Sequence, residues 1–140
     1  MNKKQLLVVW IMVFGSVLPL FAQDKHPIDK FEEECMNKDS TTAGMNNCMM
    51  EAYKQWDAEL NKYYKLLMGI LSQEEKQQLK DAQIVWLKYR DLETKFRMDT
   101  FLNNQGTMYS NMAMSEKLDI VKQRALELTS LYDTLKVVRE

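Results

Sequence analysis

The sequence has little proline, glycine and histidine, and each shortage restricts the fold or the chemistry. Of 140 residues, 2 are proline and 4 are glycine, and no proline follows Pro27. A sandwich or barrel needs frequent turn residues, so this composition disfavours a β-rich fold. The single histidine, His26, excludes a multi-histidine metal site and argues against the usual catalytic triads. No glycine-rich phosphate-binding motif is present either. We therefore predict no catalytic residue, no metal ligand and no cofactor.

Charge and hydrophobicity place the chain among globular proteins. Charged residues make up 28% and hydrophobic residues 46% of the sequence, which suits neither a disordered tail nor a polytopic membrane protein. The length fits one domain.

Residues 1–22 have the features of a cleavable secretory signal. Two lysines precede the apolar run 6–14, and Ala22 supplies the small residue that a signal peptidase needs. A permanent membrane anchor is the alternative, but the run is shorter than the roughly 20 residues that span a bilayer. We expect cleavage after Ala22 to release one domain, residues 23–140, to the periplasm or the exterior, with no membrane association afterwards.

Export predicts a disulfide between the two cysteines. Cys35 and Cys48 are 13 residues apart and do not form a C-x-x-C redox motif. The residues between them are rich in turn formers, so the chain can reverse there. Closing so short a loop stabilises the fold by ~3 kcal/mol in the chain-entropy model.

Apolar residues that recur every three or four positions predict three long helices. The first is capped within 40–42 and runs to about Leu71, and the second begins at a capping box in 72–75. A break at 103–106 precedes the third helix, whose seam extends over 114–135. Short connections make neighbouring helices antiparallel. The expected fold is all-α: an up-down-up bundle of three long helices with a short N-terminal helical segment tied on by the disulfide.

The second long helix has one interrupted seam. Its three- and four-residue spacing selects Leu79, Ala82, Trp86, Tyr89, Glu93 and Phe96. Glu93 interrupts this apolar stripe, and we expect it to face the last helix and pair with Lys117.

The first hairpin predicts a polar network between two helices. If the chain turns near residues 71–72, facing residues have numbers that sum to roughly 144. Asn61 then lies opposite Gln83, and Asp57 lies close to Trp86. We interpret the set as a structural hydrogen-bond network that fixes the helix register, because nothing in the sequence indicates a catalytic cleft. Its members are Asp57, Asn61, Tyr64, Gln83, Trp86, Arg90 and Asp91.

The same residues resemble the LprI-type lysozyme-inhibitor domain family over about residues 30 to 135. The pattern is Cys35, Met45, Cys48, then Asp57-x-x-Leu60-Asn61-x-x-Tyr64, then Leu79-x-x-x-Gln83-x-x-Trp86-x-x-x-Arg90-Asp91. The resemblance implies a small exported helical domain and, for the member that names the family, inhibition of lysozyme.

The chain departs from this family at two cysteine positions. The family usually has a cysteine where Glu93 stands and another in the last helix, at or near Glu116. Antiparallel helices that turn near residues 104–105 place these positions opposite each other. The resemblance therefore implies a disulfide between the last two helices that this chain lacks, so contact between these helices depends on the packing of their side chains.

The net charge points to a protein partner. Two of the 19 basic residues lie in residues 1–22, so 17 remain against 20 acidic residues, a net charge of −3 that gathers in residues 23–39. This disfavours nucleic acid and favours a basic protein such as a lysozyme-like muramidase. As candidate partner-binding residues we select four acids: Glu32, Glu33, Glu34 and Asp39. The alternative is that they only solubilise the segment.

Two other functions compete with inhibition. The first is soft-metal binding, in which methionine thioethers bind Cu(I). The candidate methionines form two groups: Met108, Met112 and Met114, or Met45, Met49 and Met50. Methionines on helix seams more often fill core gaps. The second is muramidase activity itself, but no pair of acids lies in a context that would separate two pKa values. We expect an exported binding protein, a lysozyme inhibitor that occludes its partner, and not an enzyme. A structural interaction domain of the cell envelope is a further alternative.

Overall fold

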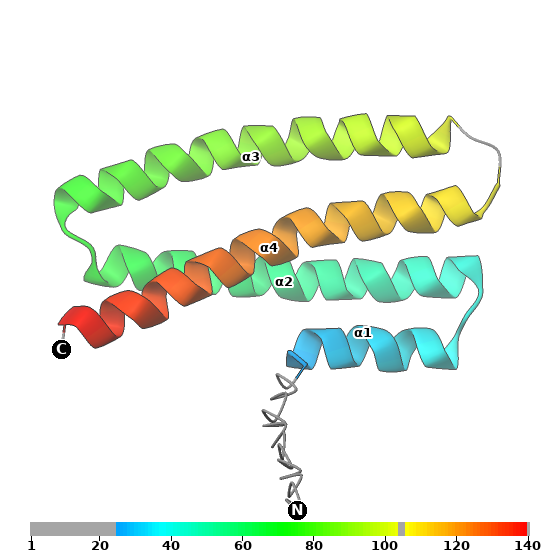
Figure 1. The fold of residues 1–140 in the computed structure, drawn as a ribbon, viewed down its shortest axis with the longest axis horizontal. Helices are drawn as coiled ribbons and strands as arrows, with labels where there is room; N and C mark the ends of the chain where they lie inside the picture. Colours follow the sequence, from blue (N-terminus) through cyan, green and yellow to red (C-terminus); the bar gives the residue numbers. More distant parts are fainter. Residues whose placement is uncertain (1–24, 104–105, 140) are drawn as a thin grey trace, which may run out of the picture.

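Four helices make up the computed structural model, which describes residues 25–103 and 106–139. They are α1 (Pro27–Lys38), α2 (Thr42–Ile70), α3 (Gln73–Leu102) and α4 (Met108–Arg139), and the described residues contain no strand (Figure 1). The all-α prediction of three long helices and a short N-terminal helix is confirmed. The expected signal peptide, residues 1–22, lies outside the described residues. None of the described helices is long and apolar enough to cross a membrane.

Local hydrogen bonds set the helix starts where the sequence places them. Thr41 caps α2, because its hydroxyl accepts from the backbone N–H of Gly44 at 3.0 Å. Ser72 and Glu75 form the capping box of α3, in which each side chain accepts from the other residue's backbone N–H. These bonds use N–H groups that a helix start otherwise leaves without partners.

The hydrophobic core lies between α2 and α4, and α1 closes one side of it. Trp56, Leu67, Val121 and Leu128 are its largest fully buried side chains. Both seams expected on the first and last long helices supply this core. The methionines at seam positions take part: Met49 is buried, and Met45 and Met114 pack against the core.

The disulfide between Cys35 and Cys48 is present, with 5.7 Å between the Cα atoms. It ties the end of α1 to the beginning of α2. The carboxylate of Asp39 occupies the space where a side chain at Gly44 would have its Cβ. A side chain at residue 44 would therefore displace the Asp39 carboxylate from its bonds to Thr41.

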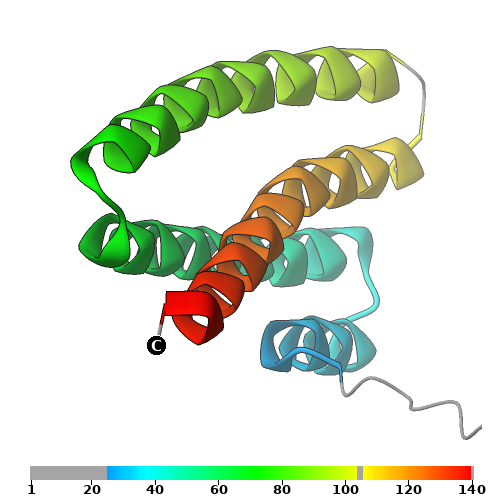
Figure 2. The same cartoon turned by 60° about the vertical axis from the view of Figure 1, so that its left-hand side comes forward.

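The arrangement of α3 differs from a compact bundle. It packs on α4, which also packs along α2, whereas α2 and α3 make almost no backbone contact. Two views agree that α3 and α1 lie at opposite edges of the molecule, with α2 and α4 between them (Figures 1 and 2).

The seam expected on α3 is wrong in part. Tyr89 and Phe96 are 50% and 64% exposed, and Gln83 is the only buried residue that the structure describes on this helix. Polar contacts with α4 orient α3: the carbonyl oxygen of Gln83 accepts from Arg124 Nε at 3.2 Å. An apolar pattern alone does not detect such contacts, since it ranks Gln83 as a surface residue.

Glu93 faces α4 as expected, but its partner is not Lys117. Arg97 pairs with Glu93 at 2.7 Å within α3 and also with Glu116 on α4. The ammonium of Lys117 lies instead 4.8 Å from the centre of the Tyr53 ring. Arg97 thus bridges Glu93 and Glu116, the two positions where the resemblance implies cysteines, so an ion pair links the helices there.

Candidate functional site

The four acids selected on and after α1 do not form one uniform surface. Glu33 pairs with Lys25 at 2.9 Å, and Glu34 is exposed. Asp39 belongs to the turn, because its carboxylate accepts from the hydroxyl and the backbone N–H of Thr41. These two bonds lower the pKa of Asp39. Asp39 therefore has a structural task in addition to its charge.

Glu32 lies in an acidic cleft of about 410 Å³ between α1 and α4. Its walls carry four carboxylates and two ammonium groups: Asp29, Glu32, Glu33 and Asp119 against Lys25 and Lys122. Asp29 pairs with Lys122 at 2.7 Å. Burial first, and then the charge of Asp29, raise the pKa of Glu32. The cleft has an excess of negative charge and is open to a basic group from a partner.

The residues expected to form a network between the first two long helices surround a groove instead. Six of the seven line a cavity of about 500 Å³ between α2 and α3: Asp57, Asn61, Tyr64, Gln83, Trp86 and Arg90. The hairpin register therefore brings them together as the sequence predicts. Asp91, the seventh, lines the neighbouring cavity.

The polar side chains of this groove make their hydrogen bonds elsewhere. Asn61 donates to the carboxylate of Asp57 at 3.1 Å within α2, and Arg90 Nε donates to Asp91 at 2.9 Å within α3. Gln83 accepts from Arg124 on α4. Over residues 25–103 and 106–139, no hydrogen bond joins α2 to α3, so direct bonds between the helices are not what fixes their register. Because the side chains of Asn61, Gln83 and Arg90 line the open groove between α2 and α3, a ligand in the groove could reach them.

The groove continues beyond Arg90. A second cavity of about 420 Å³ shares Arg90 and is also lined by Tyr53, Lys95, Met98 and Lys117. Neither the apolar pattern nor the hairpin register singles out these residues. Met98 follows Arg90 by eight residues and could have been placed on the same side of α3, whereas Lys95 follows it by five and could not. Tyr53 and Lys117 depend on how α2 and α4 cross.

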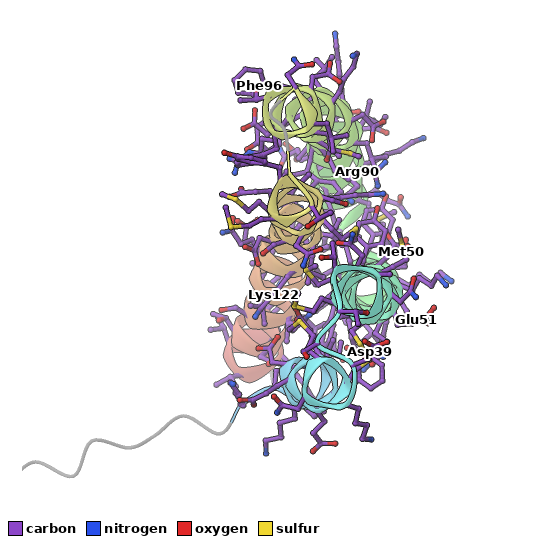
Figure 3. All side chains as sticks on the ribbon, turned by 90° about the vertical axis from the view of Figure 1, so that its right-hand side faces the viewer. Asp39, Met50, Glu51, Arg90, Phe96 and Lys122 are labelled. Carbon is purple, nitrogen blue, oxygen red and sulfur yellow. A yellow bond between two sulfur atoms is a disulfide. The ribbon has the colours of Figure 1, made fainter. Side chains whose placement is uncertain are left out.

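Figure 3 views the helices nearly end-on and shows which side of α3 faces the groove. Arg90 lies on the side of α3 towards α2, whereas Phe96 lies on the outer side, away from the other helices. The guanidinium carbon of Arg90 is 5.6 Å from the centre of the Trp86 ring, and that of Arg124 is 5.9 Å from it. These cation–π contacts hold Trp86 at the boundary between groove and interior. The described residues contain no cluster of three histidine, cysteine or carboxylate side chains that would hold a metal.

The helices and the disulfide define a small all-α domain that has charged clefts on its surface. Its sequence identifies the group to which it belongs. The chain is a member of the LprI lysozyme-inhibitor family, which it matches over residues 35–128.

A solved structure shows the same fold. The chain is similar to a crystal structure of an uncharacterised protein from Burkholderia thailandensis, with a TM-score of 0.72 and 31% sequence identity. The similarity covers 78% of this chain and 54% of that one, so the chain spans about half the length of this relative. No curated protein matches the chain significantly.

Proposed function

We propose that residues 23–140 act outside the cytoplasm as an inhibitor of a basic, lysozyme-like muramidase. Membership of the LprI family carries this proposal, since the match covers residues 35–128. A muramidase cleaves glycan in a cleft with two carboxyl groups, and an inhibitor needs only to cover that cleft. No catalytic group is required of the inhibitor.

The acidic cleft between α1 and α4 is the docking surface that we favour. Its carboxylates outnumber its ammonium groups by four to two. The exposed Glu34 lies on another side of α1, in the cavity next to the disulfide. The disulfide holds α1 in place, so this surface is ordered before it meets a partner. Charge complementarity of this kind speeds association more than it slows dissociation.

Charge reversal on α1 tests the docking surface. In the triple variant Glu32→Lys, Glu33→Lys and Glu34→Lys, we expect the association rate with hen lysozyme to fall at least tenfold and the dissociation rate to change less. The fold should survive, because the Glu33 pair is exposed and such pairs contribute only ~0.2–1 kcal/mol.

The matched control reverses three exposed acids away from α1: Glu74→Lys, Asp81→Lys and Asp133→Lys. It changes the net charge by the same amount, so it separates local docking from overall charge. Equal association rates for the two triple variants would contradict docking at the cleft between α1 and α4. Inhibition as such is tested separately, by the rate of cell-wall lysis.

A further inference from the structure

Three cavities follow one another beside α3 and share lining residues, and we call the row that they make the furrow. The 500 Å³ and 420 Å³ cavities share Arg90, and the latter shares Met98, Leu102 and Lys117 with a third cavity of about 290 Å³. The α3 residues along the furrow extend from Lys80 to Leu102. At 1.5 Å per residue this length is about 33 Å. A furrow this long and open suits a linear polymer better than a small compact ligand.

The walls of the furrow carry planar hydrogen-bonding groups: a carboxylate that accepts, a guanidinium that donates and two amides that do both. Asn61 and Asp57 come from α2, and Gln83 and Arg90 come from α3. Gln83 uses its carbonyl oxygen on Arg124, and its amide N–H groups have no partner within the described residues. The rings of Tyr64 and Trp86 lie among these groups. The guanidinium groups of Arg90 and Arg124 already lie over the Trp86 ring, so Tyr64 is the main aromatic side chain that such a surface offers to a ligand beside its polar groups.

The charges along the first two cavities nearly cancel. Four cations, Lys80, Arg90, Lys95 and Lys117, stand against three carboxylates, Asp57, Asp91 and Asp99. A strongly basic or acidic partner gains little from such a wall, in contrast to the acidic cleft beside α1. A neutral polymer with many hydroxyl and amide groups fits both the charge and the hydrogen-bonding pattern.

We propose that this furrow binds a neutral glycan chain of β-1,4-linked N-acetylated amino sugars. Each ring presents a C–H face to an aromatic side chain and hydroxyl and acetamido groups to the carboxylate, amide and guanidinium side chains around it. The choice of an N-acetylated chain rests on the proposed function, because muramidases cleave chains of this kind. Glycan binding itself is a separate activity, on a different face from the acidic cleft.

Direct titration without lysozyme tests the proposal. The probe is the hexamer of β-1,4-linked N-acetylglucosamine, added to oxidised residues 23–140 and followed by calorimetry and tryptophan fluorescence. Trp56 is only 1% exposed, so a fluorescence change reports mainly on Trp86 in the furrow. We expect saturable binding with a fluorescence change.

Two neighbouring substitutions on α3 provide the variant and its matched control. Ile84 lines the furrow and is 55% exposed, while Val85 is 68% exposed and is absent from the cavity walls. Ile84→Arg puts a long charged side chain into the furrow and should weaken hexamer binding at least tenfold. Val85→Arg makes the same change on a side chain outside the furrow and should leave binding unchanged. Neither substitution removes a buried contact, so both proteins should fold.

The outcomes separate this proposal from inhibition. No saturable binding by the unsubstituted protein, or equal binding by both arginine variants, would overturn it. Loss of lysozyme inhibition in Ile84→Arg without any glycan binding would also overturn it, because the furrow would then take the enzyme. Glycan binding by a protein that does not inhibit lysozyme would support the furrow and contradict the proposed function.

Discussion

Arg139 near the end of α4 pairs with Glu75 in the first turn of α3, with 2.6 Å between the guanidinium nitrogen and the carboxylate oxygen. The other terminal nitrogen of Arg139 donates to the backbone carbonyl of Ile70 at 3.0 Å. The end of the last helix is therefore fastened to the turn between α2 and α3. Glu75 serves this contact and the capping box at once.

This contact predicts a loss of stability in acid. The hydrogen bond from the Ser72 backbone, and then the bond from Arg139, lower the pKa of Glu75 from 4.5 to about 2. A carboxylate whose pKa is lower in the folded state stabilises the fold above its unfolded pKa. That stabilisation is lost as the pH falls from about 4.5 to about 2. The melting temperature, followed by circular dichroism, should fall across this window.

Glu75→Gln isolates the contribution, because glutamine can still accept the bond from Ser72 but does not titrate. This variant should lose less stability between pH 5 and pH 2 than the unsubstituted protein does, because the Glu75 carboxylate takes up its proton in this range. The adjacent exposed Glu74→Gln is the control and should leave the pH profile unchanged. Identical profiles for both variants would show that Glu75 does not supply the acid sensitivity.

Removal of the disulfide should destabilise the protein by about 3 kcal/mol, the value expected for closing a loop of this size. The double variant Cys35→Ser and Cys48→Ser in urea unfolding measures this loss. Alkylation of the native protein without reductant should give no mass adduct, since the two cysteines are paired. Two adducts on folded protein would refute the pairing.

A second disulfide can replace the bridge that Arg97 makes. Because Arg97 pairs with both Glu93 and Glu116, these two positions face each other across α3 and α4. The variant Glu93→Cys with Glu116→Cys should oxidise spontaneously and raise the melting temperature, because the bridge adds ~3 kcal/mol to the free energy of unfolding in the chain-entropy model. Glu93→Cys with Lys117→Cys is the control and should stay reduced, as Lys117 turns towards Tyr53. Oxidation of the control alone would mean that the helix register is shifted by one residue.

Gln83 and Asn61 should differ in their effect on stability although both line the groove. Gln83 is 9% exposed and accepts from Arg124, so Gln83→Ala leaves a half-buried guanidinium without that partner. The expected loss is ~1–3 kcal/mol. Asn61 is exposed and bonds within its own helix, so Asn61→Ala should change the unfolding free energy by no more than ~0.5 kcal/mol. Equal losses in chemical unfolding would contradict this division.

Local signals in the sequence predicted most of the fold. The hydroxyl of Thr41, the capping box of Ser72 and Glu75 and the pair of cysteines each act over a few residues, so their outcome depends little on the rest of the chain. The seams of α2 and α4 were predictable for a related reason: each buries a wide apolar stripe.

The orientation of α3 and the shape of the site were less predictable. The apolar pattern favoured Tyr89 and Phe96 for the interior, but α3 is turned so that Gln83 and Arg97 meet partners on α4. Hairpin geometry brought Asn61 and Gln83 to the same place and still did not reveal the groove. The groove exists because α4 packs along α2 and holds α3 at a distance, and that packing depends on contacts between helices far apart in the sequence.

The lysis of bacterial cell walls by hen lysozyme, measured by turbidity at increasing molar excess of oxidised residues 23–140, tests the central claim most directly. We expect lysis to slow in proportion to the protein added, and the effect to weaken at 1 M salt, where the Debye length is about 3 Å and charges on the two surfaces no longer attract over distance. Full lysozyme activity at a large excess of the folded protein at low salt would contradict the inhibitory function.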